Sequence, residues 1–90
     1  MSPYKLFLKC EQEGISLKAS IILDMVANYK EIAISAVMDN CLKLGLYSPA
    51  MAHRELHWLI NNGYVICQES VMDKRAKLCS ISRKGKAFLS

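Results

Sequence analysis

The chain has 90 residues, enough for one small domain, and 52% of them are hydrophobic against 22% charged, which predicts a folded core and excludes a disordered polymer. No apolar run is long enough to span a membrane, and the first residues lack the pattern of a secretory signal, so we expect no membrane association. The net charge of +4 is uneven: residues 71–90 contain six basic residues and one acidic residue, whereas residues 1–70 contain six and seven. A basic end on a near-neutral body indicates an anionic partner that contacts one region of the protein.

No linker rich in proline or glycine and no internal repeat divides the sequence, which predicts a single domain over residues 1–90. The four cysteines contain no Cys-x-x-Cys pair, and this spacing is against a zinc ribbon or a thioredoxin-type site. Without a secretory signal we expect reduced thiols, a cytoplasmic protein, and neither metal nor cofactor. No motif for a nucleophile, a phosphate-binding loop or a carboxylate pair is present, so we expect no enzyme activity.

Helical patterns fill the first third of the chain. Ser2 and Pro3 predict the start of a helix over residues 1–14, because serine caps free backbone N–H groups and proline suits the first turn, and Gly14 predicts its end. Apolar residues at spacings of three and four predict a second helix from about Leu17 to Tyr29. A short connection, with an extended piece, follows at residues 30–32.

The next segment, residues 34–62, has the pattern of two helices joined by a short turn. The first helical stripe starts at Ile34 and meets a glycine turn at Gly45. Ser48 and Pro49 then predict a new helix start, and Gly63 predicts its stop. Two helices in this layout are typical of a DNA-reading helix–turn–helix motif.

After Gly63 the period changes to two, which predicts a β-hairpin over residues 64–82 with its reversal within residues 70–76. One face of this hairpin would carry Val65, Cys67, Cys79 and Ile81, and the opposite face Tyr64, Ile66, Leu78 and Ser80. A short closing helix is expected over residues 83–89. The fold class is therefore mainly α with a small β-hairpin, a winged helix–turn–helix.

These segments resemble the MarR family of winged-helix regulators over residues 34–89. The residues that carry the resemblance are Leu44, Gly45, Leu46, Tyr47, Ser48 and Pro49, then Leu56, Leu59, Gly63, Tyr64 and Val65, then Asp73, Lys74 and Arg75, and finally Ile81, Ser82, Lys84 and Gly85. The resemblance implies a transcriptional regulator, more often a repressor, that binds double-stranded DNA as a homodimer. Asn40 departs from the family, which usually has leucine there. The chain is also too short for the family's long terminal helices, so we expect no small-molecule effector.

The second helix of the motif supplies the candidate base-reading residues. Its inward stripe is predicted to be Ala52, Leu56 and Leu59. The candidate DNA contacts are Ser48, Ala50, Met51, His53, Arg54, His57 and Asn61. Among them Arg54 can donate two hydrogen bonds to one guanine. His53 and His57 are also four residues apart, a spacing that can chelate a metal, but an ordinary DNA-facing helix is favoured because no third ligand is nearby in the sequence.

The predicted wing supplies a second group of contacts. Lys74 and Lys77 are expected to meet phosphates, and by resemblance Arg75 reaches into the minor groove while Asp73 orients that arginine. Cys67 and Cys79 are equidistant from Asp73 and so can face each other across the hairpin. Buried packing is favoured for these thiols, and a redox role stays open.

Two further hypotheses concern partners. Tyr4, Leu6, Phe7 and Leu8 place apolar groups on more than one face of the first helix, which predicts that this helix holds a homodimer together or, alternatively, seals only its own domain. The alternative function is a winged helix that binds protein, such as an antirepressor or an assembly component. The near-neutral body with three arginines in the whole chain fits that alternative.

Overall fold

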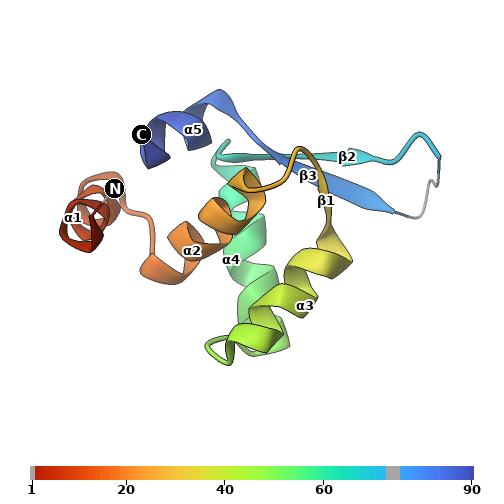
Figure 1. The fold of residues 1–90 in the computed structure, drawn as a ribbon, viewed down its shortest axis with the longest axis horizontal. Helices are drawn as coiled ribbons and strands as arrows, with labels where there is room; N and C mark the ends of the chain where they lie inside the picture. Colours follow the sequence, from red (N-terminus) through yellow and green to blue (C-terminus); the bar gives the residue numbers. More distant parts are fainter. Residues whose placement is uncertain (1, 73–75) are drawn as a thin grey trace.

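The computed structural model describes residues 2–72 and 76–90. It contains the helices α1 (Pro3–Glu13), α2 (Leu17–Ala27), α3 (Ile34–Leu44), α4 (Pro49–Asn61) and α5 (Arg83–Leu89) and the strands β1 (Ile32–Ala33), β2 (Val65–Glu69) and β3 (Lys77–Ile81) (Figure 1). The predicted order of helices and hairpin is confirmed. No helix in the described part of the chain is both long and apolar enough to cross a membrane.

Serine starts four of these helices. In each case its hydroxyl oxygen accepts a hydrogen bond from the backbone N–H three residues later, which satisfies one of the free donors of the first turn. The capping serines and their donors are Ser2 with Lys5 (3.3 Å), Ser16 with Ala19 (3.0 Å), Ser48 with Met51 (3.2 Å) and Ser82 with Gly85 (3.1 Å). Only α3 lacks such a cap, because it starts directly from β1 at Ala33.

The sheet is antiparallel, with the strand order β1-β3-β2. Sequence analysis predicted a two-stranded hairpin, and the structure adds β1 on its other side, where Ile32 pairs with Cys79. Cys79 also pairs with Cys67 of β2, so the predicted meeting of these two cysteines across the hairpin is confirmed. The base of the wing is therefore joined to the start of α3 through main-chain pairing.

The core lies around α2, which contacts α1, α3, α4, α5 and β3. Ile22, Leu23 and Val26 of this helix are fully buried, and they meet the inward stripe of α4. At the end of the molecule away from the wing, α1 lies near both chain termini (Figure 1). This arrangement leaves one face of α4 exposed to solvent, together with Ile66, Gln68, Glu69 and Lys77 on the strands of the wing.

Tyr64 is the main departure from the predicted hairpin faces. It was placed opposite the core side chains, but it is buried, with 3% of its surface exposed. Its ring stacks on Trp58 at 5.8 Å and meets the edge of Phe88 at 6.1 Å, and its hydroxyl donates to Glu13 at 3.2 Å. Alternation across a hairpin does not hold here because Tyr64 precedes β2 and lies between α4 and α5.

A buried tyrosine hydroxyl and a buried thiol, which lose a proton at alkaline pH, make the stability of the protein depend on pH. Burial raises the pKa of Tyr47 from 10.0 to about 12, and burial together with the neighbouring Cys67 raises that of Cys79 from 9.0 to about 12. Above about pH 9 the unfolded chain loses protons that the folded chain keeps, so stability falls as pH rises, by up to about 1.4 kcal/mol per pH unit for each group.

We therefore expect the free energy of unfolding, measured by urea titration, to be level between pH 7 and about pH 9 and to decline beyond it. Tyr47→Phe should reduce the decline that starts near pH 10 without removing it, because burial and the contact with Glu13 also raise the pKa of Tyr64. The substitution also removes the hydrogen bond from Tyr47 to the Lys18 carbonyl (2.6 Å) and so costs about 1 kcal/mol at neutral pH. A pH profile that stays flat to pH 12 would contradict the burial of these groups.

Candidate nucleic-acid interface

Helix α4 has two distinct faces. The predicted inward stripe of Ala52, Leu56 and Leu59 is fully buried. The opposite face carries six of the seven predicted contacts from this motif, namely Ser48, Ala50, His53, Arg54, His57 and Asn61, and all six are exposed. Most of the face predicted to read DNA is therefore accessible in the folded protein.

His53 and His57 project together from this exposed face. Their rings are stacked, with centroids 6.2 Å apart and an interplanar angle of 18°. His53 also lines a hollow of about 420 Å³ between α3, α4 and the wing, whose polar lining includes Ser35 at the start of α3 and Lys77 at the start of β3. The hollow therefore brings together Lys77 of β3, Ser35 of α3 and His53 of α4. Within the described residues, no group of three or more histidine, cysteine or acidic side chains is placed to hold a metal ion.

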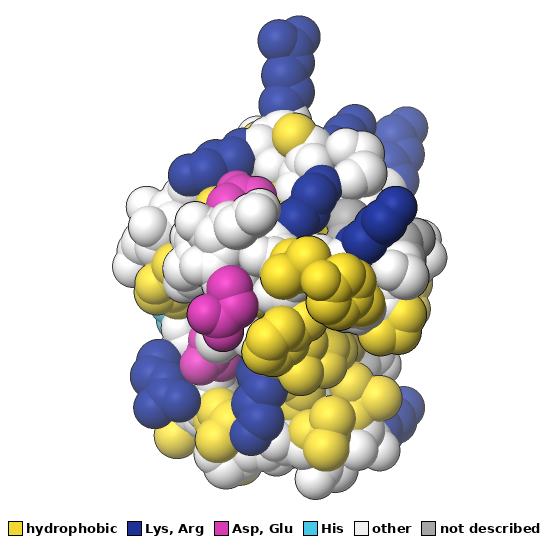
Figure 2. All heavy atoms as spheres, turned by 90° about the vertical axis from the view of Figure 1, so that its left-hand side faces the viewer, with side chains coloured by type: hydrophobic (Ala, Val, Ile, Leu, Met, Phe, Trp, Pro, Cys, Tyr) yellow, Lys and Arg dark blue, Asp and Glu magenta, His cyan; other side chains and the backbone are white. Residues whose placement is uncertain are grey.

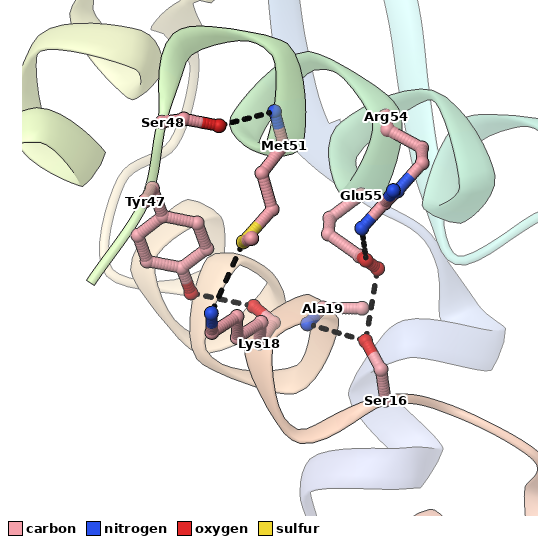
Figure 3. A network of polar contacts seen from close by, with 8 residues as sticks. All are labelled: Ser16, Lys18, Ala19, Tyr47, Ser48, Met51, Arg54 and Glu55. Carbon is pink, nitrogen blue, oxygen red and sulfur yellow. Dashed lines mark hydrogen bonds and ion pairs between the residues drawn. The ribbon is translucent and has the colours of Figure 1, made fainter.

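Met51 lies apart from the other predicted contacts. It is half-buried on the side of α4 that faces α2, and its sulfur accepts a hydrogen bond from the Lys18 ammonium at 3.1 Å (Figure 3). Tyr47 donates to the backbone of the same lysine. These contacts fix the N-terminal end of α4 against the first turn of α2.

A polar network joins the same two helices further along α4 (Figure 3). Ser16, the cap of α2, donates to one carboxylate oxygen of Glu55 at 2.8 Å, and the other oxygen lies 3.4 Å from the guanidinium of Arg54. Arg54 keeps 71% of its side chain exposed. An exposed ion pair contributes at most about 1 kcal/mol. Glu55 therefore orients the Arg54 side chain, and the guanidinium remains free to bind another partner.

The wing is formed by β2 and β3, with Lys77 exposed on β3 opposite Glu69 on β2. Lys77 is thus the one predicted wing contact within the described residues. The other three predicted wing residues, Asp73, Lys74 and Arg75, lie outside the described residues.

Sequence analysis did not identify two residues of this region, Ser35 and Glu55. Ser35 could have been identified from the sequence, because it is a polar residue in the first turn of the first helix of the predicted helix–turn–helix motif. Glu55 has no such signal, since its partner Ser16 is 39 residues away in the chain. Long-range polar contacts of this kind follow from packing and not from local pattern.

A comparison of the sequence with protein-family models and with curated proteins finds no match. Solved structures do match. Against a MarR transcriptional regulator from Methanosarcina mazei Go1 the TM-score is 0.75 at 23% identity, covering 96% of this chain and 59% of that one. Against the S. aureus MepR–DNA complex the TM-score is 0.81 at 14% identity, covering 96% of this chain and 68% of that one. Against Streptococcus pneumoniae FabT in complex with DNA the TM-score is 0.70 at 20% identity, covering 81% of this chain and 48% of that one.

These similarities establish that the chain has the winged helix–turn–helix fold of MarR-type regulators, which confirms the fold implied by the sequence resemblance. The chain spans only about half to two thirds of the length of these three structures. Shared fold by itself does not transfer function, which depends on the residues of the site.

Proposed function

We propose that this protein is a sequence-specific regulator of transcription that binds double-stranded DNA and acts as a cytoplasmic repressor. The observation that carries the proposal is the exposed face of α4, where Arg54, His53 and His57 stand beside the hollow that leads to Lys77 of the wing. An α-helix with such a face fits the major groove, and Lys77, which lines the adjacent hollow, is a cation that can contact a phosphate of the neighbouring strand.

Charge and the structural comparisons support the same proposal. Residues 71–90, which include β3 and α5, carry most of the excess positive charge. Two of the three solved structures named above were determined with DNA bound. In this chain α4 would provide the base contacts, Lys74 and Lys77 the phosphate contacts, and Arg75, oriented by Asp73, the minor-groove contact.

The test is the salt dependence of binding to duplex DNA. We expect log K to fall linearly with log salt concentration at a slope of about −0.9 for each phosphate neutralised, and an in vitro selection from random duplexes should enrich a defined site. A protein-binding module, the alternative function, would retain no duplex even at low salt. That result would overturn the proposal.

We further propose that the regulator is a homodimer held together through α1. On the inner side of this helix Cys10 is buried, and the Lys9 ammonium donates to the carbonyls of Phe88 (3.0 Å) and Ser90 (2.6 Å) at the end of α5. The outer side exposes Tyr4 and Phe7 by 72% and 53%.

Figure 2 shows hydrophobic side chains gathered in the middle of the face where α1 lies. A second copy that covers this face would remove those side chains from water. It would also give the DNA two recognition helices, which a regulator needs because one helix reads only a few base pairs. A dimer bound over a promoter would exclude polymerase.

Combined Phe7→Glu and Leu8→Glu substitutions are expected to yield a monomer, because they place charge in an apolar contact. Sedimentation equilibrium should give twice the chain mass of 10.1 kDa for the unaltered protein and the chain mass for the variant. Lys5→Glu is the matched control: it lowers the net charge by the same two units on the same exposed helix but removes no apolar group, so it should remain dimeric. An unaltered protein that stays monomeric at high micromolar concentration would refute the dimer.

A further inference from the structure

Strand β2 forms an edge of the sheet. In the strand order β1-β3-β2 one side of β2 pairs with β3, and no strand of the described chain pairs with its other side. Figure 1 shows both wing strands extending away from the helices. Proteins usually protect such an edge with lysine, proline or a bulge. Strand β2 contains neither lysine nor proline, and its register with β3 runs without a bulge from Val65 to Glu69.

The hydrogen-bond ladder shows which main-chain groups of β2 face outward. Bonded and non-bonded residue pairs alternate in an antiparallel ladder. The N–H of Ser70, directly after β2, donates to the Ala76 carbonyl at 2.8 Å. Every second residue back along β2 therefore bonds to β3. The residues between them, which include Cys67 and Glu69, direct their N–H and C=O groups to the open side, and a row of such groups is a template for one more strand.

A hollow lies beside this edge on the outer face of the sheet, which is the face opposite the buried Cys79. Side chains alternate across a strand, so Leu78 projects to this outer face. The hollow has a volume of about 240 Å³, and its lining includes Leu78, Glu69 at the end of β2 and Met72 beyond that strand. It shares no lining residue with the hollow beside α4, to which Lys77 belongs.

The lining of the outer hollow is apolar and acidic. Leu78 is half-buried, and Val71 and Met72 are 98% and 94% exposed. Glu31 and Glu69 add two exposed carboxylates, and no lysine or arginine of the described chain lines the hollow. This acidic surface belongs to a chain whose net charge is +4. Two carboxylates disfavour an anionic partner such as DNA and favour a cationic one.

Lysine and arginine side chains match such a lining. Their stems are apolar and their ends are cationic, so the stem can cover an apolar side chain while the end pairs with a carboxylate. Ile66, which is 44% exposed, lies on the same outer face next to the open edge. Arginine suits the site best because its planar group donates two hydrogen bonds to one carboxylate. The edge and the hollow together therefore favour an extended segment with basic side chains.

We propose that β2 and the outer face of the wing bind an extended segment of another protein that has arginine at alternate positions. The main chain of this segment pairs with Cys67 and Glu69 as a further strand. Its arginine stems lie over Ile66, and their guanidinium groups reach Glu69 and Glu31. A second copy of this chain is a poorer occupant, because its own β2 has no basic residue and would leave both carboxylates unpaired. The proposal is independent of DNA binding, since the exposed face of α4 takes no part in it.

The probe is a blocked eight-residue peptide of alternating arginine and valine, added to the full chain labelled for amide NMR. In the free protein we expect the amide hydrogens of Cys67 and Glu69 to exchange faster than those of Ile66 and Gln68, which bond to β3. Saturating peptide should slow exchange at Cys67 and Glu69 by about tenfold or more, because the added strand supplies their missing acceptors.

Variants and a second peptide separate charge from strand pairing. Glu69→Gln and Glu31→Gln should each weaken binding severalfold, whereas Glu11→Gln, which removes the same charge from an exposed position on α1, should not. Glu69→Pro removes an outward N–H without breaking a bond to β3, and it should weaken binding more than Glu69→Gln does. A peptide of alternating arginine and proline has the same charge but lacks half of the N–H groups, so the unaltered protein should bind it about tenfold more weakly.

The proposal is overturned if the arginine–valine peptide does not bind, or if it binds without slowing exchange at Cys67 and Glu69. Equal affinity for the two peptides would show attraction by charge without strand pairing. Binding that neither Glu31→Gln nor Glu69→Gln weakens would place the peptide elsewhere on the protein. Slow exchange at Cys67 and Glu69 without peptide, increasing with protein concentration, would show that a second copy occupies the edge.

Discussion

Gly85→Ala is expected to be the most destabilising small substitution in the described part of the chain. A Cβ at this position would lie 2.5 Å from the Tyr64 carbonyl oxygen, 2.7 Å from a methylene carbon of Ile81 and 3.1 Å from a methyl carbon of Leu23. The closest of these atoms belongs to backbone and has no rotamer to adopt. We expect a loss of about 2–3 kcal/mol or more and a fall in thermal midpoint of roughly 10 °C or more.

The physical reason is the way the wing returns to the core. The Ser82 hydroxyl donates to the Gly63 carbonyl at 2.6 Å and accepts from the Gly85 N–H, so the start of α5 is held against the end of α4. Tyr64 lies in this junction with its backbone against Gly85. Only a residue without a side chain lets α5 approach so closely.

Helix propensity makes the opposite prediction, and this makes the experiment decisive. Gly85 lies inside α5, where alanine would ordinarily be better by about 1 kcal/mol. Lys86→Ala, at the next and exposed position, reports the ordinary effect of alanine in this helix and should change stability little. A Gly85→Ala protein as stable as the Lys86→Ala protein would show that α5 does not lie against Tyr64.

Local signals in the sequence predicted much of this fold. Ser2, Ser48 and Gly63 predicted helix boundaries correctly, because capping and glycine turns depend on a few neighbouring residues. The change of period after Gly63 predicted the hairpin and the pairing of its two cysteines for the same reason. The exposed face of α4 followed from helical spacing alone.

Features that depend on distant parts of the chain were not predicted. The burial of Tyr64 needs α5 to fold back on α4, and the pairing of Ile32 with Cys79 joins residues 47 positions apart. The contact of Ser16 with Glu55 likewise needs α2 to lie against α4. In the candidate site, sequence reasoning therefore found the residues that face outward but not the carboxylate that orients one of them.

Arg54→Ala is expected to abolish most of the preference for the selected DNA site while leaving most of the non-specific affinity. Arg54 is exposed on α4, and among the described residues its side chain makes a weak contact with Glu55. An arginine that donates two hydrogen bonds to one guanine contributes about 1–3 kcal/mol of discrimination, which corresponds to a loss of roughly 5- to 150-fold on the selected site. The measurement is the ratio of affinities for the selected duplex and for a random duplex at one salt concentration.

Arg54→Lys separates charge from geometry in the same experiment. Lysine keeps the positive charge but lacks the planar fork, so this variant should retain the affinity and salt slope for random DNA and still lose the preference. Glu55→Gln should act oppositely: it removes a negative charge from α4 while its amide oxygen can still accept from Ser16, so affinity for both duplexes should rise by about the same factor, roughly twofold to fivefold. If Arg54→Ala weakens both duplexes equally and Arg54→Lys restores both, Arg54 binds phosphate, and the bases are read from the side of α4 that carries His53 and His57.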